Sequence, residues 1–147
     1  IPLLACLILN GCATTQYGNF IQNASLDASH AMAEDAAVQI GRLYPPATTQ
    51  FTLVHPVKDA FGQMLTEKLR VAGFAVQEAF EPSIEQSLFA VPQPQEEQKA
   101  GIRLSYIVDQ SEHIYHTNIQ IGDRHLSRAF MAQDNDFYPA GHWVSRQ

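Results

Sequence analysis

The chain has 147 residues, 46% of them hydrophobic, which is enough for one domain with its own core. Its formal net charge is −6, and no stretch of the sequence is strongly basic. Because binding to nucleic acid needs a cationic surface that displaces counterions from phosphates, this charge argues against direct contact with DNA or RNA.

Residues 1–9 are uncharged and stop just before Asn10-Gly11-Cys12. A helix that spans a bilayer needs about 20 apolar residues, whereas the apolar core of a secretory signal peptide has about 7–15. We therefore interpret residues 1–11 as the remnant of a signal peptide. The order Leu-Asn-Gly-Cys resembles a bacterial lipobox, which predicts that Cys12 receives diacylglycerol and becomes the new N-terminus. A buried N-terminal strand or helix with an incidental cysteine is the alternative.

Acylation of Cys12 would anchor the protein stably, because each buried methylene adds about 0.8 kcal/mol to membrane binding. Ala13 follows the cysteine, where an Asp would favour retention in the inner membrane. We therefore expect a lipid anchor in the bacterial outer membrane, with the protein on its periplasmic face. The second cysteine, Cys6, lies in the removed segment, so the mature domain would hold no disulfide.

Residues 12–24 form a predicted extended segment behind the lipid. Tyr17, Phe20 and Ile21 are apolar, but they do not continue as a helical stripe. A peptide this short cannot bury these side chains by itself. It lies either on its own domain or on a partner.

The next segment, residues 25–46, is typical of a helix. Ser25 or Asp27 can cap its start, and the pair Pro45-Pro46 ends it. Its apolar residues recur at 4-4-3 spacing, which places them on one helical face. These residues are Met32, Ala36, Ile40 and Leu43.

A strand–helix–strand unit follows. Residues 50–54 predict a strand, and residues 57–74 predict a helix with an apolar stripe, ended by Gly73 in the left-handed position of a C-cap. Residues 74–80 predict a strand that returns beside the first one. The connection would be right-handed if the two strands are parallel in one sheet.

Residues 81–100 mix proline with glutamine and glutamate, a composition typical of a mobile spacer. From residue 101 the apolar residues alternate, which predicts strands over 102–108, 113–121 and 124–131 joined by turns at 110–112 and at Gly122-Asp123. We therefore expect an α+β domain over residues 25–147. Two helices would pack on a small mixed sheet of about five strands that ends in an antiparallel meander.

The sequence gives no positive argument for an enzyme. It has no G-x-S-x-G elbow, P-loop or G-x-G-x-x-G motif, so we assign no catalytic residue and no cofactor beyond the lipid on Cys12. His30 and Glu34 can share a helical face, whereas the odd separation of His113 and His116 places them on opposite faces of a strand. We therefore predict no metal site. Further aromatic residues are candidates for an interface or for the core itself: Tyr44, Tyr138 and Trp143.

Four stretches in order resemble the TrbH family, the lipoproteins of Trb-type conjugation systems. They are the lipobox with CATTQYGNFIQNA, then LYPPATTQF, DAFGQMLTEKLRVAGFAV and YPAGHWV. The resemblance implies a structural subunit of the outer-membrane core complex of a conjugative type IV secretion system, which forms mating pairs. It implies TrbG-like and TrbI-like partners and a ring-forming homo-oligomer. It also implies that residues 13–24 clasp the TrbG-like subunit, with Tyr17, Phe20 and Ile21 as anchors.

Two other functions stay open at this point. A surface-exclusion lipoprotein would act in the recipient cell and be dispensable in the donor. An envelope hydrolase or carbohydrate-binding lipoprotein would need a pocket in which polar groups converge.

Overall fold

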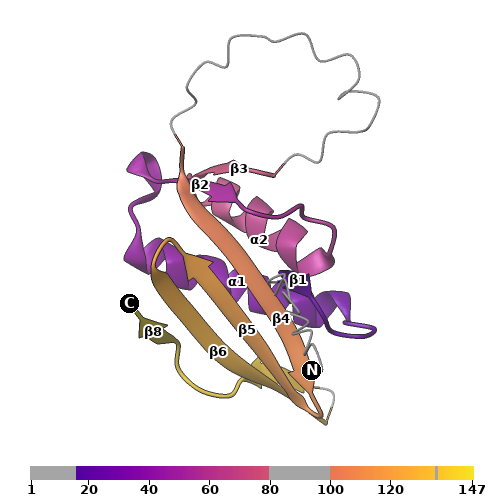
Figure 1. The fold of residues 1–147 in the computed structure, drawn as a ribbon. Coiled ribbons are helices and arrows are strands. Elements are labelled where there is room, and N and C mark those ends of the chain that lie inside the picture. Colours follow the sequence, from indigo (N-terminus) through magenta and orange to yellow (C-terminus); the bar gives the residue numbers. More distant parts are fainter. Residues whose placement is uncertain (1–15, 80–99, 135) are drawn as a thin grey trace, which may run out of the picture.

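The computed structural model describes residues 16–79, 100–134 and 136–147. Within these ranges eight strands form one mixed sheet, in the order β3-β2-β4-β5-β6-β7, with β1 beside β4 and β8 beside β6. Figure 1 shows α1 and α2 side by side on one face of this sheet. The elements are β1 Gly18–Asn19, α1 Leu26–Leu43, a 3-10 turn Pro46–Thr48, β2 Gln50–Leu53, α2 Ala60–Val71, β3 Ala75–Gln77, β4 Ile102–Ser111, β5 Ile114–Ile121, β6 Arg124–Gln133, β7 Asp136–Pro139 and β8 Val144–Arg146.

The expected α+β class is confirmed, but the sheet has more strands than the five predicted. The additional strands are short: β1 has two residues, β7 four and β8 three. A period of two cannot be recognised over so few residues. These short segments are strands because they pair with the long strands β4 and β6, and their own sequences carry no strand pattern.

Helix α1 begins and ends close to the predicted positions. Ser25 is the cap, and its Oγ accepts the backbone N–H of Ala28 at 3.1 Å. Asp27 lies instead in the first turn, where its charge complements the helix dipole. Of the predicted apolar face, Met32, Ala36 and Ile40 are buried, whereas Leu43 is only partly buried against the core. The helix also buries three further alanines and one serine: Ala28, Ala33, Ala37 and Ser29.

The strand–helix–strand unit is confirmed. Strands β2 and β3 are parallel, with Phe51 opposite Val76, and α2 connects them. Asp59 caps α2 by accepting the N–H of Gly62 at 3.0 Å. Gly73 follows the helix with φ +97°, as predicted for this end. The return strand is shorter than expected, because it ends at Gln77.

The meander β4-β5-β6 is antiparallel and carries one face of the core. Tyr106, Ile119 and Leu126 lie side by side across its three strands and are buried. The turn predicted at residues 110–112 begins later than expected, because Gln110 and Ser111 still belong to β4. Their polar side chains break the sequence pattern, but the backbone ladder continues through them.

The C-terminal segment is fastened to α1 through one carboxylate. Trp143 Nε1 donates to Asp35 Oδ2 at 2.8 Å, and Arg128 Nη1 donates to both Asp35 oxygens at 2.8 and 2.7 Å. Arg128 Nε also donates to the carbonyl of Gly141 at 2.9 Å. Trp143 is half-buried and packs against the core of its own domain.

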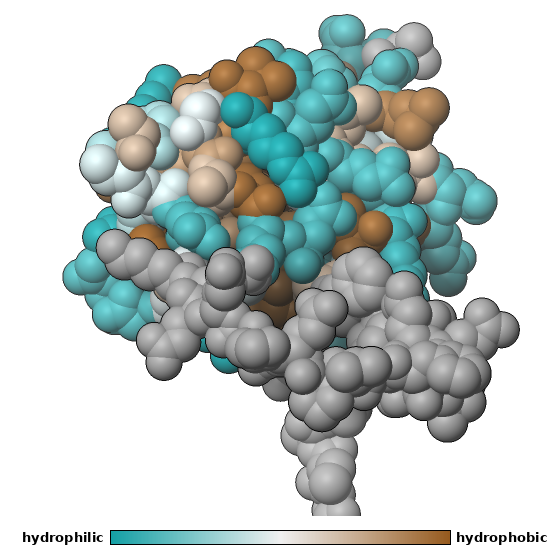
Figure 2. All heavy atoms as spheres, turned by 90° about the horizontal axis from the view of Figure 1, so that it is seen from above, coloured by the Kyte–Doolittle hydropathy of each residue, from teal (hydrophilic) through white to brown (hydrophobic). Residues whose placement is uncertain are grey.

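The surface of the domain is mainly hydrophilic in the view from above (Figure 2). Seen from above, apolar residues form small separate groups among hydrophilic ones (Figure 2). No helix in the described ranges is long and apolar enough to cross a membrane. Residues 1–11 and Cys12 lie outside the described residues, as does the predicted spacer 81–100 apart from Ala100.

Candidate partner-binding site

The segment that follows the predicted lipid site lies on its own domain. Gly18 and Asn19 form β1, which runs parallel to β4 opposite Ile107 and Val108. The pairing continues one residue further, because the N–H of Phe20 donates to the carbonyl of Val108 at 2.8 Å. The side chain of Asn19 then accepts the N–H of Ile21 at 2.9 Å and turns the chain away. Three residues, Gly18, Asn19 and Phe20, thus fix the segment to β4.

A histidine side chain fills the gap between β2 and β1 along that edge. Strand β2 pairs with β4 as far as Leu104, and β1 begins its pairing at Ile107. Between them, His55 Nε2 lies 3.4 Å from the backbone nitrogen of Tyr106, and His55 Nδ1 lies 3.2 Å from the carbonyl of Pro56. The neutral tautomer with its proton on Nδ1 satisfies both contacts.

Three rings connect the N-terminal segment to the core, and we call them the aromatic stack: Tyr17, His55 and Tyr106. The ring of Tyr17 stacks on His55 with centroids 5.4 Å apart and planes 12° apart. His55 in turn meets the buried ring of Tyr106 edge-on at 4.6 Å. Tyr17 is therefore half-buried and held by its own domain.

The aromatic stack rests on the start of α2. Tyr106 donates its hydroxyl to Asp59 Oδ2 at 2.5 Å, while the other oxygen of Asp59 caps the helix. Burial raises the pKa of Tyr106 well above its ordinary value, and the hydrogen bond and the charge of Asp59 raise it further. Gly62 lies so close that a Cβ there would be 1.9 Å from the Tyr106 hydroxyl oxygen. Sheet and helix are therefore joined without free space.

The three residues predicted as anchors have different surroundings. Tyr17 belongs to the aromatic stack, and Ile21 is half-buried against the hydrophobic core. Phe20 lies between them with 48% of its surface exposed. Of the three, Phe20 presents the ring that is open to a partner. His55 cannot be singled out from the sequence, because a single histidine after a strand belongs to no recognisable motif.

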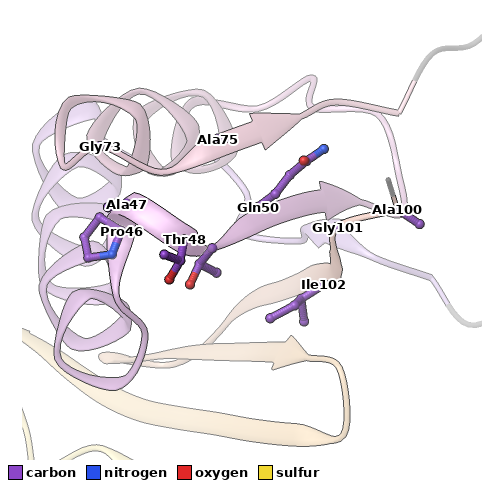
Figure 3. A pocket seen from close by; sticks show the side chains of 10 residues that line it. Pro46, Ala47, Thr48, Gln50, Gly73, Ala75, Ala100, Gly101 and Ile102 are labelled. Atoms are coloured by element: carbon purple, nitrogen blue, oxygen red, sulfur yellow. The ribbon is translucent and has the colours of Figure 1, made fainter. Parts of the chain in front are cut away.

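A separate hollow of about 430 Å³ lies where the parallel strands β3, β2 and β4 begin (Figure 3). Its polar side chains are two threonine hydroxyls and one amide, from Thr48, Thr49 and Gln50. These groups can form hydrogen bonds, but they do not transfer protons near neutral pH. The remaining lining is backbone and small apolar groups: Pro46, Ala47, Gly73, Ala75, Ala100, Gly101 and Ile102.

The histidines are spread over the domain. His30 lies 3.6 Å from Glu34 on the exposed side of α1, so the predicted shared face is confirmed. His116 Nδ1 lies 2.9 Å from Asp109 Oδ1 across β4 and β5. In the part of the chain that the structure describes, no three histidine, cysteine, aspartate or glutamate residues gather as metal ligands do.

A comparison with family models matches residues 14–147 to TrbH, described as conjugal transfer protein TrbH. No curated protein and no solved structure matches the chain. The family match covers nearly the whole chain, including β1, the aromatic stack and the C-terminal strands. This family description indicates a location in the cell envelope and partners in a transfer complex. The chain belongs to the TrbH family of conjugal transfer proteins.

Proposed function

We propose that this protein is an outer-membrane lipoprotein, anchored through Cys12, and a structural subunit of the core complex of a conjugative type IV secretion system. Its family membership supports the role in conjugal transfer, and the lipobox-like Leu-Asn-Gly-Cys supports the anchor. It acts without catalysis, by holding larger TrbG-like and TrbI-like subunits at the membrane. Many copies confined to one membrane plane gain avidity from a high effective concentration.

The observation that carries this proposal is the fixed position of the segment next to the anchor. Four residues lie between Cys12 and Tyr17, and the five steps of chain that join them span at most about 18 Å. The aromatic stack and β1 then hold the chain against β4. The domain is therefore presented close to the membrane surface, with the ring of Phe20 exposed for a TrbG-like subunit.

Replacing Phe20 alone tests the contact without disturbing the fold. Tyr17 and Ile21 contact the protein's own domain, so their replacement would detach the segment from that domain as well as weaken any binding to the partner. Val38 is the matched control, because it is 51% exposed on α1 while Phe20 is 48% exposed. We would purify tagged Phe20→Ala and Val38→Ala proteins from donor membranes in mild detergent and identify the proteins recovered with them.

We expect Phe20→Ala to lose most of the TrbG-like and TrbI-like subunits and to lower the frequency of DNA transfer, while Val38→Ala keeps both. Unchanged recovery with Phe20→Ala would refute the contact. Recovery of the native protein alone, from intact envelopes, would refute the core-complex role. A phenotype restricted to recipient cells would instead support surface exclusion.

The anchor needs its own experiment. Cys12→Ser is expected to abolish incorporation of labelled fatty acid, release the protein from the membrane fraction and remove most DNA transfer. Cys6→Ser is the matched control, because it lies in the segment that the signal-peptide interpretation removes. Normal transfer by an unacylated Cys12→Ser protein would show that anchoring is not needed.

A further inference from the structure

The meander β4-β5-β6 carries positive and negative side chains at opposite ends of its strands. Strands β4, β5 and β6 lie side by side, with the turn at Gly122 at one end and the turns at Glu112 and Asp134 at the other (Figure 1). Strand β5 has eight residues, so the two ends are about 27 Å apart. Positive side chains gather at the first end and negative ones at the second.

The basic end consists of Arg103, Arg124 and Arg146. The N–H of Gly122 donates to the carbonyl of Arg103 at 2.8 Å, and Arg124 Nη1 donates to Ser145 Oγ at 3.4 Å, next to Arg146. Among the described residues of this end, Asp123 in the turn is the acidic one. Arg103 and Arg146 are exposed, and neither has a carboxylate partner among the described residues.

The acidic end consists of Glu112, Asp134 and Asp136, all exposed. Glu112 and Asp134 have positive φ values of 56° and 50°, as residues at tight turns do. None of the three forms an ion pair with another described residue. In a chain whose other carboxylates contact arginine, lysine or histidine at several places, three acidic side chains remain unpaired at this end.

Between these turns lies a hollow of about 570 Å³. Its lining residues include the acidic Glu112 and Asp134 and the apolar Ile114 and Met131. His113, Ala132 and Gln133 complete the lining. Ile114 is 37% exposed there. This combination suits an arginine side chain, whose methylene stem covers apolar surface while its planar guanidinium binds carboxylates.

We propose that the basic end of one copy docks into the acidic hollow of a second copy of this chain. Because the two surfaces lie at opposite ends of the meander, the contact is head-to-tail, and such a contact builds rings or open filaments rather than a closed dimer. Exposed ion pairs are individually weak and are screened by salt. The association therefore needs many copies confined to a membrane, and in this it rests on the proposed function.

Cysteine crosslinking of the full chain in donor membranes tests the geometry. One cysteine would replace Gln133 beside the acidic hollow, and the other would replace Val144 in β8, close to Arg146. We expect a protein with both cysteines to give a ladder of dimers, trimers and larger species on oxidation. A protein with either cysteine alone should stay monomeric. Dimers from a single cysteine, or no ladder at all, would overturn the proposal.

Charge reversal then tests the chemistry on the same readout. Arg103→Glu with Arg146→Glu, or Glu112→Arg with Asp134→Arg, should each reduce the ladder about tenfold, and the chain with all four changes should restore it. Arg42→Glu, an exposed arginine in α1, is the matched control and should leave the ladder unchanged. Failure of the fourfold variant to restore the ladder would overturn the contact.

Co-purification distinguishes this contact from the proposed function. A lost ladder with TrbG-like subunits still recovered would refute the copy-to-copy contact alone. Loss of those subunits on reversing the acidic end, with the ladder intact, would assign the hollow to another partner and also refute it.

Discussion

Replacing Gly62 by alanine tests the join between helix α2 and the sheet. A Cβ at Gly62 would lie 1.9 Å from the hydroxyl oxygen of Tyr106 and 2.8 Å from Val57 Cγ1. Tyr106 cannot simply move aside, because its ring is buried and its hydroxyl donates to Asp59. Either the ring leaves its position or α2 shifts away from β4.

The expected magnitude follows from three contributions. Forcing an extra carbon into a packed core costs about 1–3 kcal/mol, and losing a hydrogen bond to a charged carboxylate costs about 1.5–3 kcal/mol. Alanine in place of glycine within a helix returns about 0.5–1 kcal/mol. We therefore expect Gly62→Ala to lower the free energy of unfolding by about 2–5 kcal/mol.

Urea denaturation, followed by circular dichroism and by the fluorescence of the single tryptophan, Trp143, measures this change. Gly41→Ala is the matched control, because a Cβ at Gly41 in α1 meets nothing within 4 Å and should be neutral or stabilising. Tyr106→Phe removes the atom of closest approach, so Gly62→Ala should cost less in that background. If Gly62→Ala were as stable as Gly41→Ala, the packing described for Tyr106 would be refuted.

Three further outcomes are expected. The raised pKa of Tyr106 stabilises the fold below pH 10, the ordinary pKa of tyrosine, and this stability is lost as the pH rises further, because the unfolded chain releases the proton first. In an absorbance titration Tyr106 should therefore ionise only as the protein unfolds, and Tyr106→Phe should remove that step. Asp35→Ala should lower the free energy of unfolding by about 2–3 kcal/mol, because Arg128 and the indole N–H of Trp143 lose their acceptor. Replacement of the exposed Glu34 by alanine should change it by less than about 0.5 kcal/mol, and equal effects of the two changes in urea denaturation would contradict this. Gly101→Ala should cost about 2 kcal/mol by the same assay, because its Cβ would lie 2.7 Å from a backbone oxygen, while Gly141→Ala, in open space, should be neutral.

Features encoded by neighbouring residues could be predicted from the sequence. Ser25 caps α1 through an atom three residues away, and Gly73 and Gly122 supply the positive φ that their turns require. The parallel pairing of β2 with β3 adds a longer contact, but the helix between them limits where the second strand can return. Local chemistry therefore determined most of the α+β class.

Features that depend on distant partners could not be predicted. Asn19 pairs with Val108, and Trp143 donates to Asp35, across most of the chain. A two-residue strand has no period, and a tryptophan near the end of the sequence looks the same in a core as at an interface. His55 shows this most clearly, because its role arises only from the gap that two other strands leave along β4.

The candidate site shows why residue type alone does not define a binding surface. The sequence does not distinguish Tyr17, Phe20 and Ile21, since each is apolar and each follows the predicted lipid site. The structure separates them: two contact the domain, and Phe20 is left exposed by the pairing of its backbone with β4. A triple replacement would therefore release the segment and remove the contact at once. Only the single Phe20→Ala change distinguishes an anchor for a partner from an anchor for the fold.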